Sequence, residues 1–301
     1  MQHIIDLAQR QGYVTAAQVS DLGRASHTLG RLVADGRLVR ASRGIYLPPA
    51  SRFRPQTHAL LVRATLDDDP FAVASHHSAL ALHGIALFDV DWGQVHLLDA
   101  RTSSRIRDHR HWHVLRAADQ VVEVDGYRVA GVPLALAQVA AQFGITAGLV
   151  AIDDALHRGC CTRDDVASVL ASGRLRRGVV AARRAVELAD ERTESPGESR
   201  LRWILSNSPW HFEIQANVGG PGAGYRVDHL VEGRLVVEFD GAVKYDGPAG
   251  RSALLAEKAR EDWIRERGFG FLRVVWSELD HPAQVQRRIS RTLLQTPLRL
   301  P

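Results

Sequence analysis

Three carboxylates, Asp228, Glu238 and Asp240, fall in a short stretch in which apolar residues alternate with polar ones. Alternation with a period of two predicts β-strands, and the glycine-containing segment 232–234 predicts a tight turn between two of them. Carboxylate oxygens gathered on one face of a strand pair are hard ligands of the kind that Mg²⁺ prefers. The residue types and their spacing therefore point to a site for a divalent cation.

The length of the turn decides which side chains share a face. A three-residue loop places Val231 opposite Leu235, and the same register puts Asp228 opposite Glu238, with Cβ atoms about 4.5 to 5.5 Å apart. Because alternate residues of a strand share a face, the carboxylates would gather on one side and an apolar set on the other. That apolar set is Val227, Val231, Leu235, Val237 and Phe239. A two-residue loop would mix Glu238 into the apolar face, so the pattern favours the odd loop length.

A fourth carboxylate, Glu198, lies upstream at the expected start of a helix. Ser195 is a good N-cap, Pro196 suits the first helical position, and an apolar stripe follows. Glu198 stands at the third helical position, where a capping box also places a glutamate, so it has a structural role to fill as well as a chemical one. The two roles can coexist. Like charges that face each other across strands are destabilising, so the acidic face needs a cation, and a divalent metal is the simplest one.

A helix with an early Glu198, a strand bearing Asp228 and a strand bearing Glu238-x-Asp240-Gly241 resembles the PD-(D/E)xK nuclease superfamily, in its branch related to very-short-patch-repair endonucleases. The resemblance continues through a loop with Lys244, a helix over 254–268 and a strand over 269–276. It covers roughly the last hundred residues. It implies a restriction-endonuclease-like core with the element order αβββαβ.

The resemblance also implies roles for individual residues. Mg²⁺, or Mn²⁺ in its place, would be held by Asp228, Glu238 and the main-chain carbonyl of Phe239, and would activate a water for hydrolysis of DNA. The remaining catalytic residues would be Glu198, Asp240 and Lys244, and Lys258 and Arg260 would hold the DNA backbone. The superfamily usually places a lysine two residues after its second acidic ligand, where this chain has Asp240. This departure leaves open whether the domain cuts DNA.

The N-terminal 50 residues predict three short helices, the second capped by Thr15 and the third by Ser26, followed by a short hairpin. This arrangement resembles a winged helix-turn-helix. The third helix would enter the major groove of DNA and the arginines around the hairpin would contact phosphates. The residues expected to face DNA are Ser26, His27, Thr28, Arg31, Arg37, Arg40 and Arg43.

Residues 51–190 predict a mixture of short strands and helices. Together with the N-terminal unit, this segment resembles AbiEi-type antitoxins of type IV toxin–antitoxin systems, which implies a cognate toxin protein as a partner. His109, His111 and His113 alternate along one predicted strand, a spacing that could bind a transition metal. Neighbouring arginines and the lack of a nearby acidic or cysteine ligand favour a solvated face instead.

Composition sets the outer limits. The chain has 301 residues, 45% of them hydrophobic and 24% charged, which is typical of a globular protein. A net charge of +4 permits a polyanionic partner. The two cysteines are neighbours, Cys160 and Cys161, and fit no zinc spacing. No signal peptide and no apolar run of about 18 residues is found, so we expect a cytoplasmic protein without membrane contact.

These observations predict a mixed α/β protein with a winged helix-turn-helix domain over 1–50, a mixed middle segment over 51–190 and a nuclease-like domain over 191–301. The first functional hypothesis is a DNA-binding protein with a Mg²⁺-dependent endonuclease domain. The alternative is an antitoxin and transcriptional regulator whose nuclease-like domain is inactive and serves folding or dimerisation. A homodimer is compatible with either.

Overall fold

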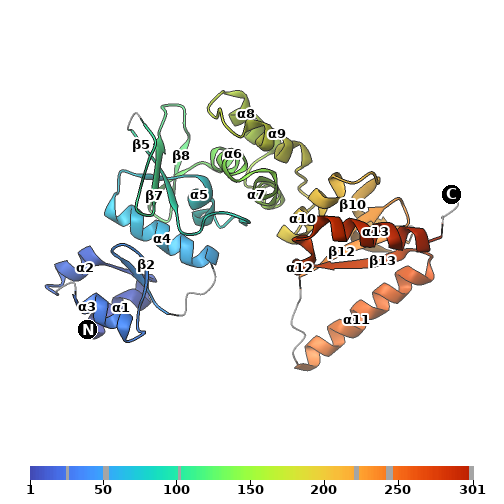
Figure 1. The fold of residues 1–301 in the computed structure, drawn as a ribbon, viewed down its shortest axis with the longest axis horizontal. Coiled ribbons are helices and arrows are strands. Elements are labelled where there is room, and N and C mark those ends of the chain that lie inside the picture. The colour runs from blue at the N-terminus through green and yellow to red at the C-terminus, as the bar shows by residue number, and fades with distance from the viewer. Residues whose placement is uncertain (25–26, 50–53, 101–102, 220–223, 242–246, 298–301) are drawn as a thin grey trace. The chain divides into compact units, whose positions relative to one another are not determined.

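The computed structural model describes residues 1–24, 27–49, 54–100, 103–219, 224–241 and 247–297. The chain folds into two compact units. The first contains residues 1–155 and 160–187, and the second contains residues 156–159 and 188–301. Each unit has helices and sheets of its own (Figure 1), so the predicted mixed α/β class is confirmed.

The N-terminal part of the first unit contains three helices and a small antiparallel sheet with the strand order β1-β3-β2. Its elements are α1 (Gln2–Gln11), β1 (Val14–Thr15), α2 (Ala16–Asp21), α3 (His27–Ala34), β2 (Val39–Ser42) and β3 (Ile45–Leu47). Helix α1 ends at Gly12, whose φ of 86° suits a glycine. Thr15 caps α2 as predicted, since its side chain accepts the N–H of Gln18 in a capping box.

The middle part is built on a six-stranded mixed sheet with the order β6-β7-β5-β4-β9-β8. Its strands are β4 (Val73–Ala74), β5 (Val95–Asp99), β6 (Arg105–Arg107), β7 (Arg110–Val114), β8 (Val121–Val124) and β9 (Tyr127–Ala130). Its helices are α4 (Arg54–Asp68), α5 (His76–Leu82), α6 (Val132–Phe143), α7 (Ile145–His157), α8 (Arg163–Ala171) and α9 (Val179–Leu188). Helix α5 packs against both α6 and β5, which places the start of α5 beside the sheet.

The second unit has the predicted element order, a helix, three strands, a helix and a strand. These are α10 (Pro196–Ser206), β10 (Phe212–Val218), β11 (Tyr225–Val231), β12 (Leu235–Asp240), α11 (Gly247–Glu266) and β13 (Gly270–Val275). Two further helices follow, α12 (Trp276–Leu279) and α13 (Pro282–Gln295). The sheet has the order β10-β11-β12-β13, and β13 runs parallel to β12 while the other pairs are antiparallel.

The hairpin between β11 and β12 has the predicted three-residue loop, because Val231 pairs with Leu235. Glu232 and Gly233 both have positive φ, 50° and 62°, as a tight hairpin turn requires. The paired residues end at His229 and Val237, one position short of the predicted Asp228–Glu238 pair.

The apolar face of this hairpin differs from the prediction at one position. Val231, Leu235 and Val237 pack in one core cluster, with Phe239 against it. Val227 instead belongs to a second cluster, with Leu230 and Val236, so its predicted place was wrong. Val227 lies outside the segment of β11 that pairs with β12, which extends only to His229, and it pairs with Ala216 of β10, a member of the second cluster.

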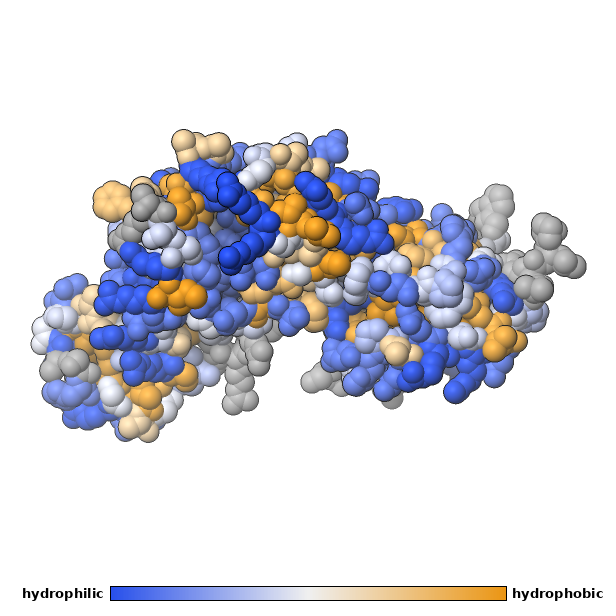
Figure 2. All heavy atoms as spheres, turned by 45° about the horizontal axis from the view of Figure 1, so that its top comes forward, coloured by the Kyte–Doolittle hydropathy of each residue, from blue (hydrophilic) through white to orange (hydrophobic). Residues whose placement is uncertain are grey.

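Hydrophilic residues cover most of the face drawn in Figure 2, with apolar side chains in small groups between them. This is the ordinary mixture on the surface of a folded domain, where apolar atoms still contribute more than half of the exposed area. Among the described residues, no helix combines the length and the apolar character needed to span a bilayer.

Candidate functional site

Two of the four residues predicted to contact DNA from the third helix are exposed on α3. His27 and Arg31 are exposed, one helical turn apart on the outer face of α3. Thr28 is 5% exposed and lies on the inner face beside Leu29 and Leu32, so the prediction that it is exposed was wrong. The reason is helical periodicity, since Thr28 and Leu32 are four residues apart and share the face that packs on the core. Ser26 lies outside the described residues.

Three arginines lie on or next to the small sheet. Arg37 donates to Gln2 Oε1 over 3.2 Å, and Arg40 donates to the carbonyl of Ser42 over 3.4 Å. Arg43 lies 3.9 Å from a carboxylate oxygen of Asp108. All three arginines are exposed. Contacts of this length at a water-facing surface are weak, so these cations are accessible to an external anion.

In the second unit, Glu198 is held by polar groups at the start of α10. Ser195 Oγ donates to Glu198 Oε1 over 2.7 Å, and the N–H of Glu194 donates to Oε2 over 3.1 Å. The side chain of Gln215 donates to the same Oε2 over 2.9 Å. Ser195 accepts the N–H of Glu198 in turn, as predicted for an N-cap. The helix start therefore uses both oxygens of this carboxylate.

Glu238 has a cationic partner within the chain. Arg260 of α11 donates from Nη1 to Oε2 over 3.0 Å and from Nη2 to Oε1 over 2.6 Å. The same Nη2 also donates to the carbonyl of Arg226 over 2.8 Å. Both partners are largely buried, at 23% exposure for Arg260 and 12% for Glu238. A two-pronged pair of this kind is strong and directional, and it supplies the positive charge that the acidic face requires.

Asp228 is the carboxylate with the most unusual environment. Its Oδ2 accepts the N–H of Phe239 over 2.9 Å. Burial, and then the charges of Glu198 and Glu238, raise the pKa of Asp228 to about 7. The bond from Phe239 and the charge of Arg260 act in the opposite direction but do not compensate fully. The structure therefore brings Asp228, Glu198 and Glu238 within electrostatic range of one another.

The remaining residues predicted for catalysis or for holding the DNA backbone are placed differently. Asp240 lies 3.9 Å from Arg273, which also pairs with Glu257 over 2.7 Å. Lys258 is exposed on α11. Lys244 lies outside the described residues, so its predicted role stays a prediction.

The carboxylates as they stand do not fit a divalent ion. A shared ion needs oxygens that converge, whereas Arg260 holds Glu238, the helix start holds Glu198, and no three acidic side chains among the described residues of this unit lie close enough to share one ion. Within the described parts of the chain, one group of three or more histidine, cysteine or acidic side chains lies close enough to hold a metal, and it consists of histidines.

Comparison with known proteins adds two findings. Residues 2–49, the three helices and small sheet at the N-terminus, match the model of the family described as "Transcriptional regulator, AbiEi antitoxin". Two proteins of Mycobacterium tuberculosis, "Uncharacterized protein Rv2248" of strain H37Rv and "Uncharacterized protein MT2308" of strain CDC 1551, are each 30% identical over 267 residues. The alignments cover 87% of this chain and 94% of each relative. The chain belongs to the family of these mycobacterial proteins. Its members share both units, because an alignment of this length cannot be confined to either.

The histidines of the middle part are the residues that sequence reasoning placed wrongly. His109 is 8% exposed, and the rings of His111 and His113 are partly buried and stack with centroids 4.0 Å apart, so the expected solvated face was wrong. Their partners come from elsewhere in the chain, since His76 stacks on His113 at 4.2 Å and His96 lies 4.8 Å from His111. The alternating spacing of the three strand histidines was the available signal, but the sequence did not show that β5 and α5 bring further imidazoles to the same place.

Proposed function

We propose that this protein is a DNA-binding transcriptional regulator of the antitoxin type. The observation that carries the proposal is the match of residues 2–49 to the antitoxin regulator family. The geometry of the same segment supports it, because His27 and Arg31 face outward from α3 while Thr28 faces the core. A helix that exposes such side chains beside a small sheet with accessible arginines suits major-groove readout flanked by phosphate contacts.

The test is DNA binding by the full chain. Fluorescence anisotropy with a labelled duplex from the region upstream of its own coding sequence would be measured at several salt concentrations. We expect sequence-dependent binding whose affinity falls as salt rises, because phosphate contacts release counterions. Binding that does not distinguish this duplex from an unrelated duplex of equal length would contradict the proposal.

Arg31→Ala tests whether DNA binds through α3 or through the net positive charge of the protein. It should weaken binding, whereas Arg287→Ala, which removes an exposed arginine of α13, should leave it unchanged. Equal losses in both variants would mean that net charge, and not α3, produces the affinity.

A toxin protein is the second partner that the antitoxin description supports. Such a toxin would be encoded next to this protein, so the two can be produced together. Production of the neighbouring protein alone should arrest growth, and production of both should restore it. A neighbouring protein without effect on growth would leave the DNA-binding proposal standing and remove this part.

Hydrolysis of DNA is a second candidate function, favoured by one observation. Asp228, Glu198 and Glu238 lie close enough for the two glutamates to raise the pKa of Asp228, in a unit whose helices and strands follow the order αβββαβ. Against it, Arg260 occupies Glu238. Incubation of supercoiled DNA with the protein and Mg²⁺ or Mn²⁺, with EDTA as control, decides the matter. Cleavage that disappears in both Asp228→Asn and Glu238→Gln would establish the nuclease.

A further inference from the structure

The imidazole rings of His76, His96, His111 and His113 converge where the start of α5 meets strands β5 and β7. The rings of His76 and His113 stack with centroids 4.2 Å apart, and those of His76 and His96 lie 4.7 Å apart. The fourth ring, that of His111, stacks on His113 at 4.0 Å. One nitrogen from each of His76, His96 and His113 lies within 4.8 Å of the other two.

The fold holds these rings in place from several sides. Strands β5 and β7 run parallel with His96 beside His111 and Leu98 beside His113, so the histidines of both strands reach one face. The N–H of Ser75 donates to the carbonyl of His96 over 2.9 Å, which ties the residue before α5 to β5. Such anchored backbone lets three distant stretches of sequence present their side chains to one point.

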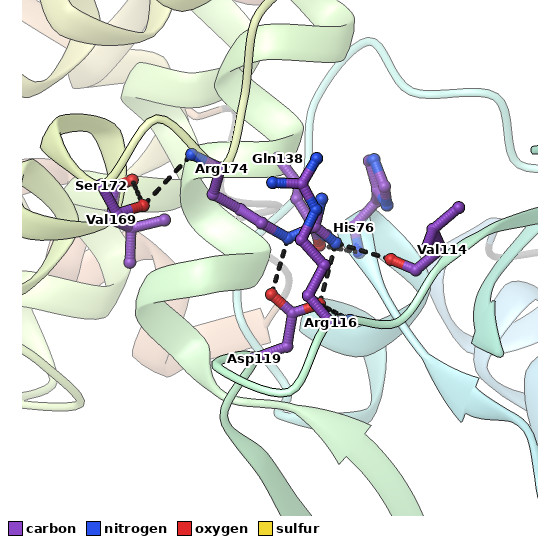
Figure 3. Close-up of polar contacts among 8 residues, drawn as sticks. All are labelled: His76, Val114, Arg116, Asp119, Gln138, Val169, Ser172 and Arg174. Carbon is purple, nitrogen blue, oxygen red and sulfur yellow. Dashed lines mark hydrogen bonds and ion pairs between the residues drawn. The ribbon is translucent and has the colours of Figure 1, made fainter. Parts of the chain in front are cut away.

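His76 has a backbone conformation that needs support. Its φ is 52°, a left-handed value that costs free energy for a residue with a Cβ. Its N–H donates to the side-chain oxygen of Gln138 of α6 over 3.0 Å (Figure 3). The conformation directs the His76 ring toward His96 and His113.

The spacing of the ring nitrogens suits a metal ion. His113 Nε2 and His96 Nδ1 are 3.1 Å apart. Two nitrogens bound to one tetrahedral Zn²⁺ at 2.0 to 2.1 Å lie about 3.3 Å from each other, so this pair already has nearly the required separation. Ser75 Oγ lies 3.0 Å from His76 Nδ1. Because this contact occupies Nδ1 of His76, Nε2 is the nitrogen that would bind the metal. Metal-bound histidines commonly make such a hydrogen bond with their second ring nitrogen.

Arg174 supports the end of the strand that carries His113. Arg174 is itself fixed by Asp119, with contacts of 2.6 and 2.9 Å, and donates to the carbonyl of Val114 over 2.8 Å (Figure 3). This arrangement holds the end of β7 and thereby fixes the backbone next to His113.

We propose that His76, His96 and His113 bind a divalent transition metal of the zinc class and that the ion joins α5 to strands β5 and β7. Three imidazoles with an open fourth position form a known zinc ligand set, and imidazole also suits cobalt and nickel. The fourth position belongs to water or to His111, whose Nδ1 is buried without a hydrogen-bond partner among the described residues. The competing explanation is a network of neutral imidazoles in which His96 and His113 share a proton and no ion.

The test uses the full chain without an affinity tag. The protein would be stripped with a chelator, dialysed against Zn²⁺ and measured by elemental analysis, and titrated separately with Co²⁺ in the visible range. We expect one ion per chain, a Co²⁺ absorption band and a higher melting temperature with Zn²⁺. Wild-type protein that retains no Zn²⁺ at micromolar concentration would overturn the proposal in favour of the metal-free network.

His113→Asn is the first variant, because His113 is the most accessible of the three. It should weaken Zn²⁺ affinity at least tenfold and remove the Zn²⁺-dependent rise in melting temperature. His109→Asn is the matched control, since His109 is also a buried histidine next to β7 but is not one of the three, and it should bind the ion as the wild type does. Equal binding in wild type and in His113→Asn would overturn the assignment.

His111→Asn then decides the fourth ligand. An unchanged Co²⁺ spectrum supports water in that position, and a changed spectrum with one ion still bound supports His111. Circular dichroism of each variant without metal shows whether it folds. If a variant does not fold, the wild-type protein is used in its place. Its histidines are photo-oxidised with and without Zn²⁺, and the extent of oxidation of each histidine is compared. Protection of His76, His96 and His113 by Zn²⁺ supports the site, and equal oxidation contradicts it.

Discussion

Arg260 holds Glu238 with both arms of its guanidinium group, at 3.0 and 2.6 Å. The acidic face of the hairpin requires a cation, and within the described residues α11 supplies one. A guanidinium cannot lower the pKa of a water as a metal ion does. The ion pair therefore explains how this unit can hold clustered carboxylates without a catalytic metal ion.

Removal of Arg260 should expose this dependence. Arg260→Ala leaves Glu238 largely buried and without its partner, beside Asp228, and should cost about 1–3 kcal/mol in the free energy of unfolding, allowing for the partial exposure of the pair. Urea denaturation measures the loss. Mg²⁺ should restore part of it in Arg260→Ala but not in wild type, because only the variant has a free acidic pocket.

The matched control is Arg267→Ala, since Arg267 also lies on the α11 side of this unit but stacks on Trp263. It should not become sensitive to Mg²⁺. A double variant, Arg260→Ala with Glu238→Gln, should be more stable than Arg260→Ala alone. If it is less stable, the attraction between the two side chains is not the source of the effect.

The stability of the second unit should depend on the protonation of Asp228. Burial and the two glutamates raise its pKa to about 7, whereas the pKa of an unfolded aspartate is about 3.9. Between these values the folded state binds more protons than the unfolded state, so the contribution of Asp228 to stability rises as the pH falls from about 7 toward 4. Above about pH 7 the contribution is constant and unfavourable.

Asp228→Asn tests this dependence. The amide cannot ionise, so the variant should be more stable than wild type near pH 8, and the difference should shrink on acidification. The urea midpoint of both proteins from pH 5 to 8 gives the comparison. Asp262→Asn, at an exposed position of α11, should show no such trend. A difference between wild type and Asp228→Asn that is flat with pH would contradict the raised pKa.

The sequence predicted the hairpin well because its information is local. The positions of Val231, Gly233 and Leu235 sufficed to set the loop length and the register. The ion pair of Glu238 could not be predicted, since Arg260 lies 22 residues further on and no local pattern marks it as a partner. Val227 was misplaced because the prediction considered the hairpin alone, whereas Val227 pairs with Ala216 of β10 and packs in the same cluster as that residue.

The histidines show the same limit in the first unit. Alternation along β7 identified His111 and His113 as neighbours on one face. Whether that face meets water or the core depends on β5, which lies next to β7 in the sheet, and on α5, which packs against β5. The spacing of residues along β7 encodes neither neighbour. Helix α4 was not predicted, because its apolar residues are not confined to one stripe.

The first unit should lose stability in acid through its neutral histidines. Burial lowers the pKa of His77 and of His113 to about 3 in each case, below the unfolded value of about 6.5. The unfolded state therefore binds more protons between these limits, and stability falls as the pH drops from about 6.5 toward 3. Hydrogen exchange at the backbone amides of the first unit can follow its unfolding, with the chelator present throughout. His113→Asn should make the decline less steep.

Gly197 is the residue that lets α10 approach β12. A Cβ at this position would lie 2.2 Å from the ring of Phe239, so Gly197→Ala should move the helix start that carries Glu198 or displace the ring. We expect a loss of about 1–3 kcal/mol in the free energy of unfolding, as for other overpacked sites. Gly30→Ala in α3, where a Cβ meets nothing within 4 Å, should instead stabilise by up to about 1 kcal/mol. Similar effects of the two substitutions would argue against the close contact.

In the N-terminal segment, residues that would contact DNA are distinct from residues that pack in the core. Arg40 is exposed and weakly bonded, so Arg40→Ala should reduce the dependence of log affinity on log salt by about one phosphate contact, nearly uniformly across sequences. Thr28→Val should leave both the affinity and the salt dependence unchanged, because Thr28 packs in the core and never reaches the groove. Anisotropy titrations from 50 to 300 mM salt, with thermal unfolding in parallel, distinguish the two. If Thr28→Val loses sequence preference but keeps the stability of the wild type, Thr28 contacts DNA and the assignment to the core is wrong.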